Sequence, residues 1–151
     1  HRYATLRIAA PHVPAELRRH AVLASLSPKG KLRYEGGTWE EGRIRLRTRS
    51  LGTFFVVADT VRPTIRPRFT AHDLSGLRSI AFSVGDNFSG VASVECRIDG
   101  RMAVLEENRV KGTVTHFFDD ELFGRRKEHT LRLTATDGAG NTRVWEGHYY
   151  R

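Results

Sequence analysis

The sequence is short of the residues and motifs on which most catalytic or covalently cross-linked proteins depend. Its 151 residues include a single cysteine, Cys96, which excludes a disulfide within the chain. No apolar run approaches the ~20 residues that cross a bilayer. No strand–GxxxxGK–helix motif for phosphate binding occurs, and no nucleophile-elbow pattern accompanies the serines, histidines and aspartates. Cys96 falls in phase with Val94 and Ile98, so we expect a buried, unreactive thiol.

Acidic residues are scarce in the first part of the chain. Residues 1–58 hold 11 Lys or Arg against 4 acids, a net charge of +7, whereas residues 59–151 hold 14 against 13, a net charge of +1. Arginine provides 21 of the 25 basic residues. A pI near 10.4 suggests nucleic-acid binding. The uneven distribution weakens that interpretation for the second part and confines it to the first.

Strand-like alternation dominates the rest of the pattern. Leu131, Leu133 and Ala135 alternate with polar residues, and the turn-forming stretch 137–141 (Asp-Gly-Ala-Gly-Asn) follows. Residues 80–98 repeat this strand–turn–strand order. We therefore predict an all-β fold, in which an immunoglobulin-like β-sandwich is preceded by a smaller β domain.

The domain boundary is predicted at two prolines, Pro63 and Pro67, which favour an extended edge conformation. We expect a small β domain over residues 1–58, a linker or first strand over 59–67, and the sandwich over 68–151. The small domain is either completed by strands upstream of His1 or packed as a small sheet against the second module. Because the chain begins with His1 and lacks an initiator Met, we expect an excised fragment.

Two segments have less regular patterns. Ala15–Ser27 fits both a helical turn and a strand, because the stretch 16–20 is helix-like and the stretch 22–26 is strand-like. Residues 119–127 read as a charged loop.

Several motifs, taken in this order, resemble one family. They are Thr48-Arg-Ser-Leu-Gly52-Thr-Phe, Asp59-Thr-Val-x-Pro63-Thr-Ile-Arg-Pro67, Asp86-Asn87-x-Ser89-Gly90, Ile98-Asp99-Gly100, and His129-Thr-Leu with Thr136-Asp137-x-x-Gly140-Asn141. Over about residues 36–151 the chain is similar to the C-terminal immunoglobulin-like region of Gram-negative envelope proteins. The catalytic domain of those proteins is a lysostaphin-type zinc metalloendopeptidase, which cuts peptidoglycan cross-bridges.

The zinc motif of that family is incomplete in this sequence. The family's site resembles His-x-x-x-Asp with a downstream His-x-His. His116 and Asp120 have the first spacing, but no His-x-His occurs anywhere in the chain. A catalytic zinc needs three protein ligands and an open position. We therefore expect no catalytic residue, no metal ligand and no cofactor here, with zinc only in a separate catalytic domain.

The resemblance thus implies a non-catalytic accessory module of a peptidoglycan metalloendopeptidase. Its expected partners are its own catalytic domain and peptidoglycan or another anionic envelope polymer; nucleic acid is disfavoured. Its expected location is periplasmic, outer-membrane-associated or secreted. The alternative is a stand-alone polyanion- or carbohydrate-binding β module.

A row of arginines is the candidate anion-binding site. Arg43, Arg45, Arg47 and Arg49 occupy every second position, so on a strand they project from one face about 6.6 Å apart. Guanidinium groups bind phosphate or carboxylate bidentately. Lipopolysaccharide phosphate, peptidoglycan carboxylate and nucleic acid all fit. The alternative is a solvated face, on which Glu35, Glu40 or Glu41 reduces the repulsion.

Two further groups of residues have both a functional and a structural interpretation. Trp39, Trp145 and Tyr149 are candidates for an aromatic contact surface that stacks on sugars, although aromatic residues of a sandwich more often fill its core. The turn residues Asp86, Asn87, Asp137 and Asn141 offer the oxygen ligands that calcium prefers. Side-chain capping of the two turns explains the same residues.

Overall fold

The computed structural model describes residues 3–151 and divides into two compact units. The first unit consists of residues up to Val61 together with 87–90 and 138–141, and the second consists of 62–86, 91–137 and 142–151. Both units are built from antiparallel strands, which confirms the predicted all-β fold. Over residues 3–151 no helix has the length and apolar character that crossing a bilayer requires.

The first unit contains two three-stranded antiparallel sheets. One has the order β1-β5-β4 and the other has the order β3-β2-β6. Its strands are β1 (Ala4–Ala9), β2 (Ala21–Leu26), β3 (Leu32–Gly36), β4 (Thr38–Glu40), β5 (Arg43–Thr48) and β6 (Phe54–Ala58).

The core of the first unit is small and draws on both of its sheets. Leu23 of β2 and Ile44 of β5 are fully buried, and Ala21 and Leu46 pack beside them. Between β3 and β4 the chain changes sheet at Gly37, whose φ is 115°. A Cβ at Gly37 would lie 2.6 Å from Cγ2 of Ile44, so only glycine permits this close approach.

The ambiguous segment Ala15–Ser27 contains both of the structures that its sequence allowed. A 3₁₀ helix covers Ala15–His20 and buries none of its residues. The strand β2 follows, and its first four residues are all buried. Four consecutive buried residues require a strand that is covered on both faces. The half of the segment with no buried residue therefore forms the 3₁₀ helix, and the buried half forms the strand.

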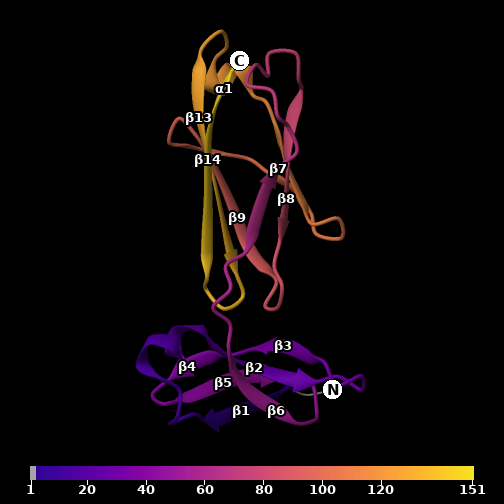
Figure 1. Cartoon of the computed structure of the whole chain (residues 1–151), viewed down its shortest axis with the longest axis vertical. Coiled ribbons are helices and arrows are strands. Elements are labelled where there is room, and N and C mark those ends of the chain that lie inside the picture. The colour runs from indigo at the N-terminus through magenta and orange to yellow at the C-terminus, as the bar shows by residue number, and fades with distance from the viewer. Residues whose placement is uncertain (1–2) are drawn as a thin grey trace. The chain divides into compact units, whose positions relative to one another are not determined.

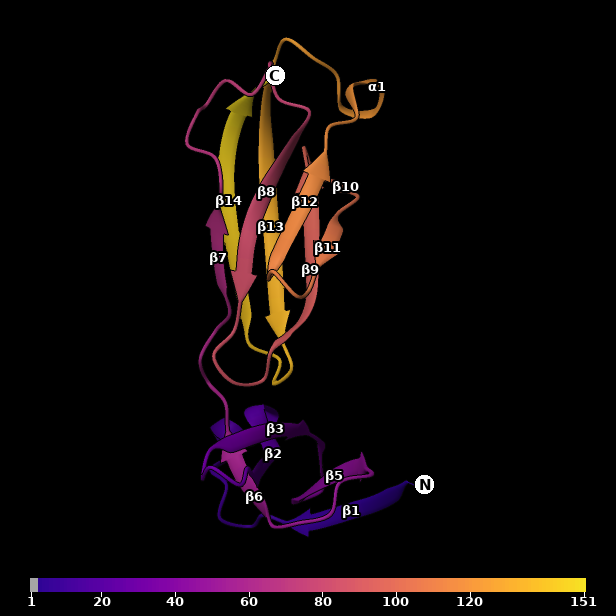
Figure 2. The same cartoon turned by 90° about the vertical axis from the view of Figure 1, so that its right-hand side faces the viewer.

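The second unit contains two four-stranded antiparallel sheets, which form two layers (Figures 1 and 2). The sheet orders are β11-β12-β8-β7 and β10-β9-β13-β14. Its strands are β7 (Thr64–Pro67), β8 (Ser79–Gly85), β9 (Val91–Ile98), β10 (Arg101–Ala103), β11 (Glu106–Asn108), β12 (Thr113–Phe117), β13 (Glu128–Asp137) and β14 (Thr142–Tyr150).

The core of this second unit is much larger and is shared by both layers. Phe82 and Val114 enter it from one sheet, and Ile98, Leu131 and Leu133 enter it from the other. Each fully buried side chain of this size contributes about 1.5–3 kcal/mol through burial. The strand order matches the two sheets of immunoglobulin-like domains, with β10 added beside β9. The immunoglobulin type of sandwich stays a prediction.

The predicted charged loop 119–127 contains one turn of helix, α1 (Asp120–Phe123). The side chain of Asp119 caps it by accepting a hydrogen bond from the backbone N–H of Leu122 at 2.9 Å. Gly124 ends the helix with a φ of 87°. The loop prediction therefore missed a capped turn whose signal, an aspartate three residues before Leu122, is present in the sequence.

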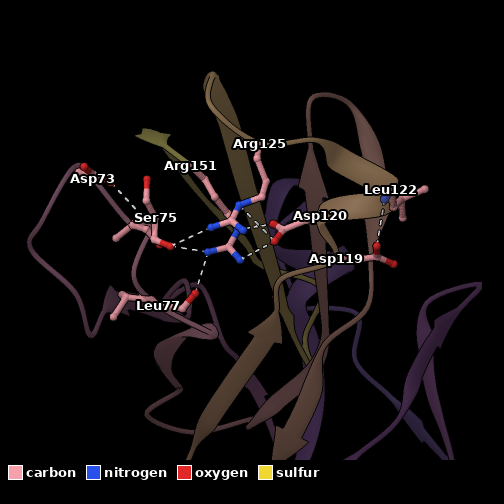
Figure 3. A network of polar contacts seen from close by, with 9 residues as sticks. Asp73, Ser75, Leu77, Asp119, Asp120, Leu122, Arg125 and Arg151 are labelled. Atoms are coloured by element: carbon pink, nitrogen blue, oxygen red, sulfur yellow. Dashed lines mark hydrogen bonds and ion pairs between the residues drawn. The ribbon is translucent and has the colours of Figure 1, made fainter.

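A buried arginine ties this helix to the neighbouring loop (Figure 3). Arg151 is 7% exposed and binds both carboxylate oxygens of Asp120, one of them at 3.0 Å. It also donates to the carbonyl oxygens of Leu74 and Leu77, at 3.1 and 2.7 Å. The hydrogen bond from Arg151 lowers the pKa of Asp120 below its ordinary value. Arg125 adds an exposed ion pair to the same carboxylate.

Candidate anion-binding face

The exposed face of the sheet β1-β5-β4 carries five arginines. Ile44, Leu46 and Thr48 of β5 are buried, so the residues between them point outward. Arg43, Arg45 and Arg47 of the predicted row thus lie on one exposed face, and Arg49, the first residue after β5, is also exposed. We define the Arg face by its five arginines, which are Arg7, Arg43, Arg45, Arg47 and Arg49.

Arg7 belongs to this face although the sequence analysis did not include it. β1 pairs with β5 in a register that sets Arg7 directly opposite Arg45. Residues opposite each other in an antiparallel pair share a face. The signal was the alternation within residues 4–9, but the pairing of β1 with β5 is a tertiary fact that alternation alone does not reveal.

Carboxylates offset little of the charge on the Arg face. Nη1 of Arg45 lies 3.2 Å from Oε1 of Glu40. Within residues 3–151 no other arginine of this face has a carboxylate within ion-pair distance. Glu35, which was expected to reduce the repulsion, instead accepts a 2.6 Å hydrogen bond from Ser25 between strands of the other sheet. Of Glu35, Glu40 and Glu41, Glu40 alone forms an ion pair with an arginine of the Arg face within residues 3–151.

A tyrosine organises one end of the Arg face. The guanidinium carbons of Arg47 and Arg49 lie 4.5 and 4.1 Å from the centre of the Tyr3 ring. Cations at this distance are attracted by the negative face of an aromatic ring. Tyr3 immediately precedes β1 and is half exposed. The pair of arginines is therefore held at the surface by an aromatic group.

The other end of the face is hollowed. A depression of about 250 Å³ is lined by Arg7, Arg43 and Arg45, with Glu40 and Glu41 at its acidic side. Glu41 occupies the turn between β4 and β5 with a φ of 45°. Together the end at Tyr3 and the hollow form a surface that favours an anionic group over a neutral or cationic one.

The three candidate contact aromatics have packing roles. Trp39 is half-buried against the core of the first unit, and the guanidinium of Arg18 lies 5.5 Å from its ring centre. Trp145 packs edge-on to Phe82 in the core of the second unit, at 5.0 Å between ring centres. Tyr149 is 2% exposed, and burial raises its pKa. Tyr149 is therefore corrected from a surface contact to a core residue.

The two residues with zinc-like spacing each have another partner. His116 is buried, and its Nδ1 lies 3.0 Å from the carbonyl oxygen of Val104, so this nitrogen carries the donated proton. Burial lowers the pKa of His116. Asp120 is bound by Arg151 (Figure 3). These contacts give each residue of the pair a structural role.

The turn residues also have structural contacts. Asp86 and Asp137 follow or end strands of the second unit, and each has a carboxylate oxygen within 4.8 Å of one on the other. Asn141 donates a 2.8 Å hydrogen bond to the carbonyl oxygen of Asp59. Calcium binding at these turns stays untested.

Cys96 is 1% exposed in the core of the second unit, and burial raises the pKa of its thiol to about 11. A thiol with this pKa is almost wholly protonated at neutral pH, and the thiolate is the reactive form. The predicted burial of Cys96 is confirmed.

Comparisons with known proteins give limited similarity. Residues 1–59 match the family model of the Zu5-like domain. Among solved structures, the chain is similar to the apo expansin of Clavibacter michiganensis, with 14% sequence identity, a TM-score of 0.41, and coverage of 97% of this chain and 76% of the expansin chain. A similarity at this level of identity and TM-score gives no basis for assigning a shared function. The comparison with curated protein sequences found no match.

Proposed function

We propose that this chain is a non-catalytic accessory module of a cell-envelope peptidoglycan metalloendopeptidase, and that its Arg face binds an anionic envelope polymer. The observation that carries the binding role is the Arg face itself, where one of five arginines has a carboxylate partner within residues 3–151. Unpaired like charges side by side on a sheet are unfavourable for folding. An anionic ligand supplies the missing negative charge, and its binding gives the five arginines of the Arg face a role.

The resemblance supplies the context of this proposal. Its motif residues form strand ends and turns of the two units, as Asp99 and Gly100 do in the turn between β9 and β10. The zinc-like residues His116 and Asp120 have the structural partners described above. An accessory module would hold the catalytic domain against its polymer, in the periplasm, at the outer membrane or outside the cell.

The alternative is a stand-alone module that binds polyanions or carbohydrates with the same face. The two proposals agree on the Arg face and differ on the catalytic partner. The upstream reading frame separates them, because an accessory module requires a His-x-x-x-Asp and a His-x-His in the same polypeptide. Zinc-dependent peptide hydrolysis by residues 1–151 alone would contradict both.

The test of the binding role is retention of the purified chain on insoluble peptidoglycan and on immobilised lipopolysaccharide polysaccharide. The double variant Arg45→Ala/Arg47→Ala should lower the affinity at least tenfold, and binding of the unaltered chain should weaken steeply as salt rises. The matched control is Arg97→Ala/Arg132→Ala, which removes two opposed arginines of the second unit. Equal retention of both double variants would exclude the Arg face as the binding surface.

A further inference from the structure

We propose that Tyr3 is a positioning residue that presents Arg47 and Arg49 as a single paired donor, and that this pair takes a phosphate group of the envelope polymer. The inference rests on the proposed function, and it adds the class of ligand and the part of the Arg face that receives it. It starts from the two guanidinium groups that share one tyrosine ring.

The geometry brings two positive charges together. Ala4 of β1 lies opposite Thr48 of β5, so Tyr3, immediately before β1, is brought beside Arg49, immediately after β5. Because both arginines lie against the same ring, their guanidinium carbons are less than about 9 Å apart. A guanidinium that stacks on a ring through its flat face keeps its N–H edge available for donation. The ring therefore reduces the freedom of both side chains without occupying their donors.

The charge of the pair indicates phosphate. In the described part of the chain, neither Arg47 nor Arg49 has a carboxylate within ion-pair distance, whereas Arg45 has Glu40. A phosphate monoester carries a charge of about −1.5 to −2 at pH 7, so one group neutralises both arginines. A carboxylate carries a single charge, and its two oxygens match one guanidinium fork. The paired donor thus favours phosphate over the carboxylates of peptidoglycan peptides.

Nucleic acid also carries phosphate, but this surface lacks a place for its bases. Proteins that bind single strands stack the bases on exposed aromatic rings. The Tyr3 ring already has the guanidinium carbons of Arg47 and Arg49 at 4.5 and 4.1 Å from its centre. Trp39, the other aromatic residue of this sheet region, lies opposite the buried Ile44 and packs on the core side. The ligand is therefore a phosphate-bearing envelope polymer, such as a phosphorylated polysaccharide.

The first experiment follows the arginine Nε–Hε resonances of the full chain by NMR while sodium phosphate or sodium acetate is added at constant ionic strength. Phosphate should shift the Arg47 and Arg49 resonances at a concentration several-fold lower than acetate does. Tyr3→Leu, which keeps an apolar side chain but removes the ring, should weaken the phosphate response about three- to tenfold. Tyr3→Phe should restore it, because the ring and not the hydroxyl carries the stack. Thr5→Ala, on the same face, is the matched control.

The expected selectivity extends to polymers. The unaltered chain should prefer phosphorylated polysaccharide to its dephosphorylated form and to single-stranded oligothymidylate of equal charge, and Tyr3→Leu should lose that preference. Thermal melting of Tyr3→Leu checks its fold, since half of Tyr3 is solvent-exposed.

Three outcomes would overturn the inference. They are equal responses to phosphate and acetate, a Tyr3→Leu variant that binds phosphate like the unaltered chain, and tighter binding of oligothymidylate. The proposed function would survive the first two if Arg45→Ala/Arg47→Ala still abolished retention on peptidoglycan. It would fail separately if neither polymer were retained by any form of the chain.

Discussion

Each unit of this protein sets two arginines directly opposite each other on an exposed sheet face, and the two units treat them differently. In the second unit Arg97 faces Arg132, and Arg132 is 2.9 Å from Glu146 while Arg97 donates to the carbonyl oxygen of Gly100. In the first unit Arg7 faces Arg45, and only Arg45 has a carboxylate partner among the described residues.

The two pairs differ in the acceptor of their second arginine. In both pairs one arginine has a carboxylate partner, Glu146 for Arg132 and Glu40 for Arg45, and in the second unit the other arginine, Arg97, also has a backbone carbonyl oxygen as acceptor. In the first unit Arg7 has no such acceptor among residues 3–151, although a single Glu or Thr substitution would relieve its repulsion with Arg45. Surfaces that keep an unfavourable charge pattern often do so for binding rather than for stability. The following predictions test this contrast between a unit in which both opposed arginines have an acceptor and a unit in which one of them lacks an acceptor.

Truncating the shared core should have the largest effect. Phe82→Ala removes a fully buried ring that contacts Phe69 and Trp145, so the free energy of unfolding of the second unit should fall by about 3–5 kcal/mol. Denaturant titration measures this change. Polymer retention by the folded protein should be unaffected, and a simultaneous loss of binding in fully folded protein would show that the two units are not independent in function.

Removing the buried arginine should come next. Arg151→Ala leaves the carbonyl oxygens of Leu74 and Leu77 without this donor and leaves Asp120 with its exposed ion pair to Arg125, at a cost of about 2–4 kcal/mol of stability. Arg125→Ala is the control, because Arg125 pairs with the same carboxylate from an exposed position and should cost less than about 1 kcal/mol. Equal costs in denaturant titration would contradict the structural role given to burial.

Acid should weaken the second unit through His116. Burial lowers its pKa from 6.5, so below pH 6.5 the unfolded chain binds a proton that the folded chain does not, and stability falls as pH falls. His116→Gln removes this proton uptake. The stability difference between the unaltered chain and His116→Gln should therefore shrink from pH 7.5 to 5.5, by at most about 1.4 kcal/mol per pH unit. A constant difference across this range would show that His116 titrates alike in both states.

The smallest effect should come from the opposed arginines. Arg7→Thr removes a charge that has no carboxylate partner within residues 3–151, so it should raise stability by up to about 0.5 kcal/mol at low salt. The gain should vanish near 1 M salt, where the screening length is about 3 Å. Arg132→Thr breaks an ion pair and should instead lower stability slightly. The opposite signs, read from melting curves, are the sharpest form of the contrast.

Local sequence patterns correctly predicted much of the fold. The alternation in residues 131–135 and 43–48 predicted strands with the correct buried faces, and Cys96 was correctly assigned to a core. The pattern failed where two local structures were equally good, as in Ala15–Ser27. It also failed where a short helix was hidden in a charged loop, because a single capped turn has too few residues to show a period.

What the sequence determined by itself was the all-β character and the outward row Arg43, Arg45, Arg47 and Arg49, because strand alternation is a local property of the backbone. Only the tertiary structure showed that Arg7 and Tyr3 lie beside that row and that Tyr149 is buried in the core. Strand register and core packing arise from contacts between residues far apart in the chain, and no local pattern specifies them.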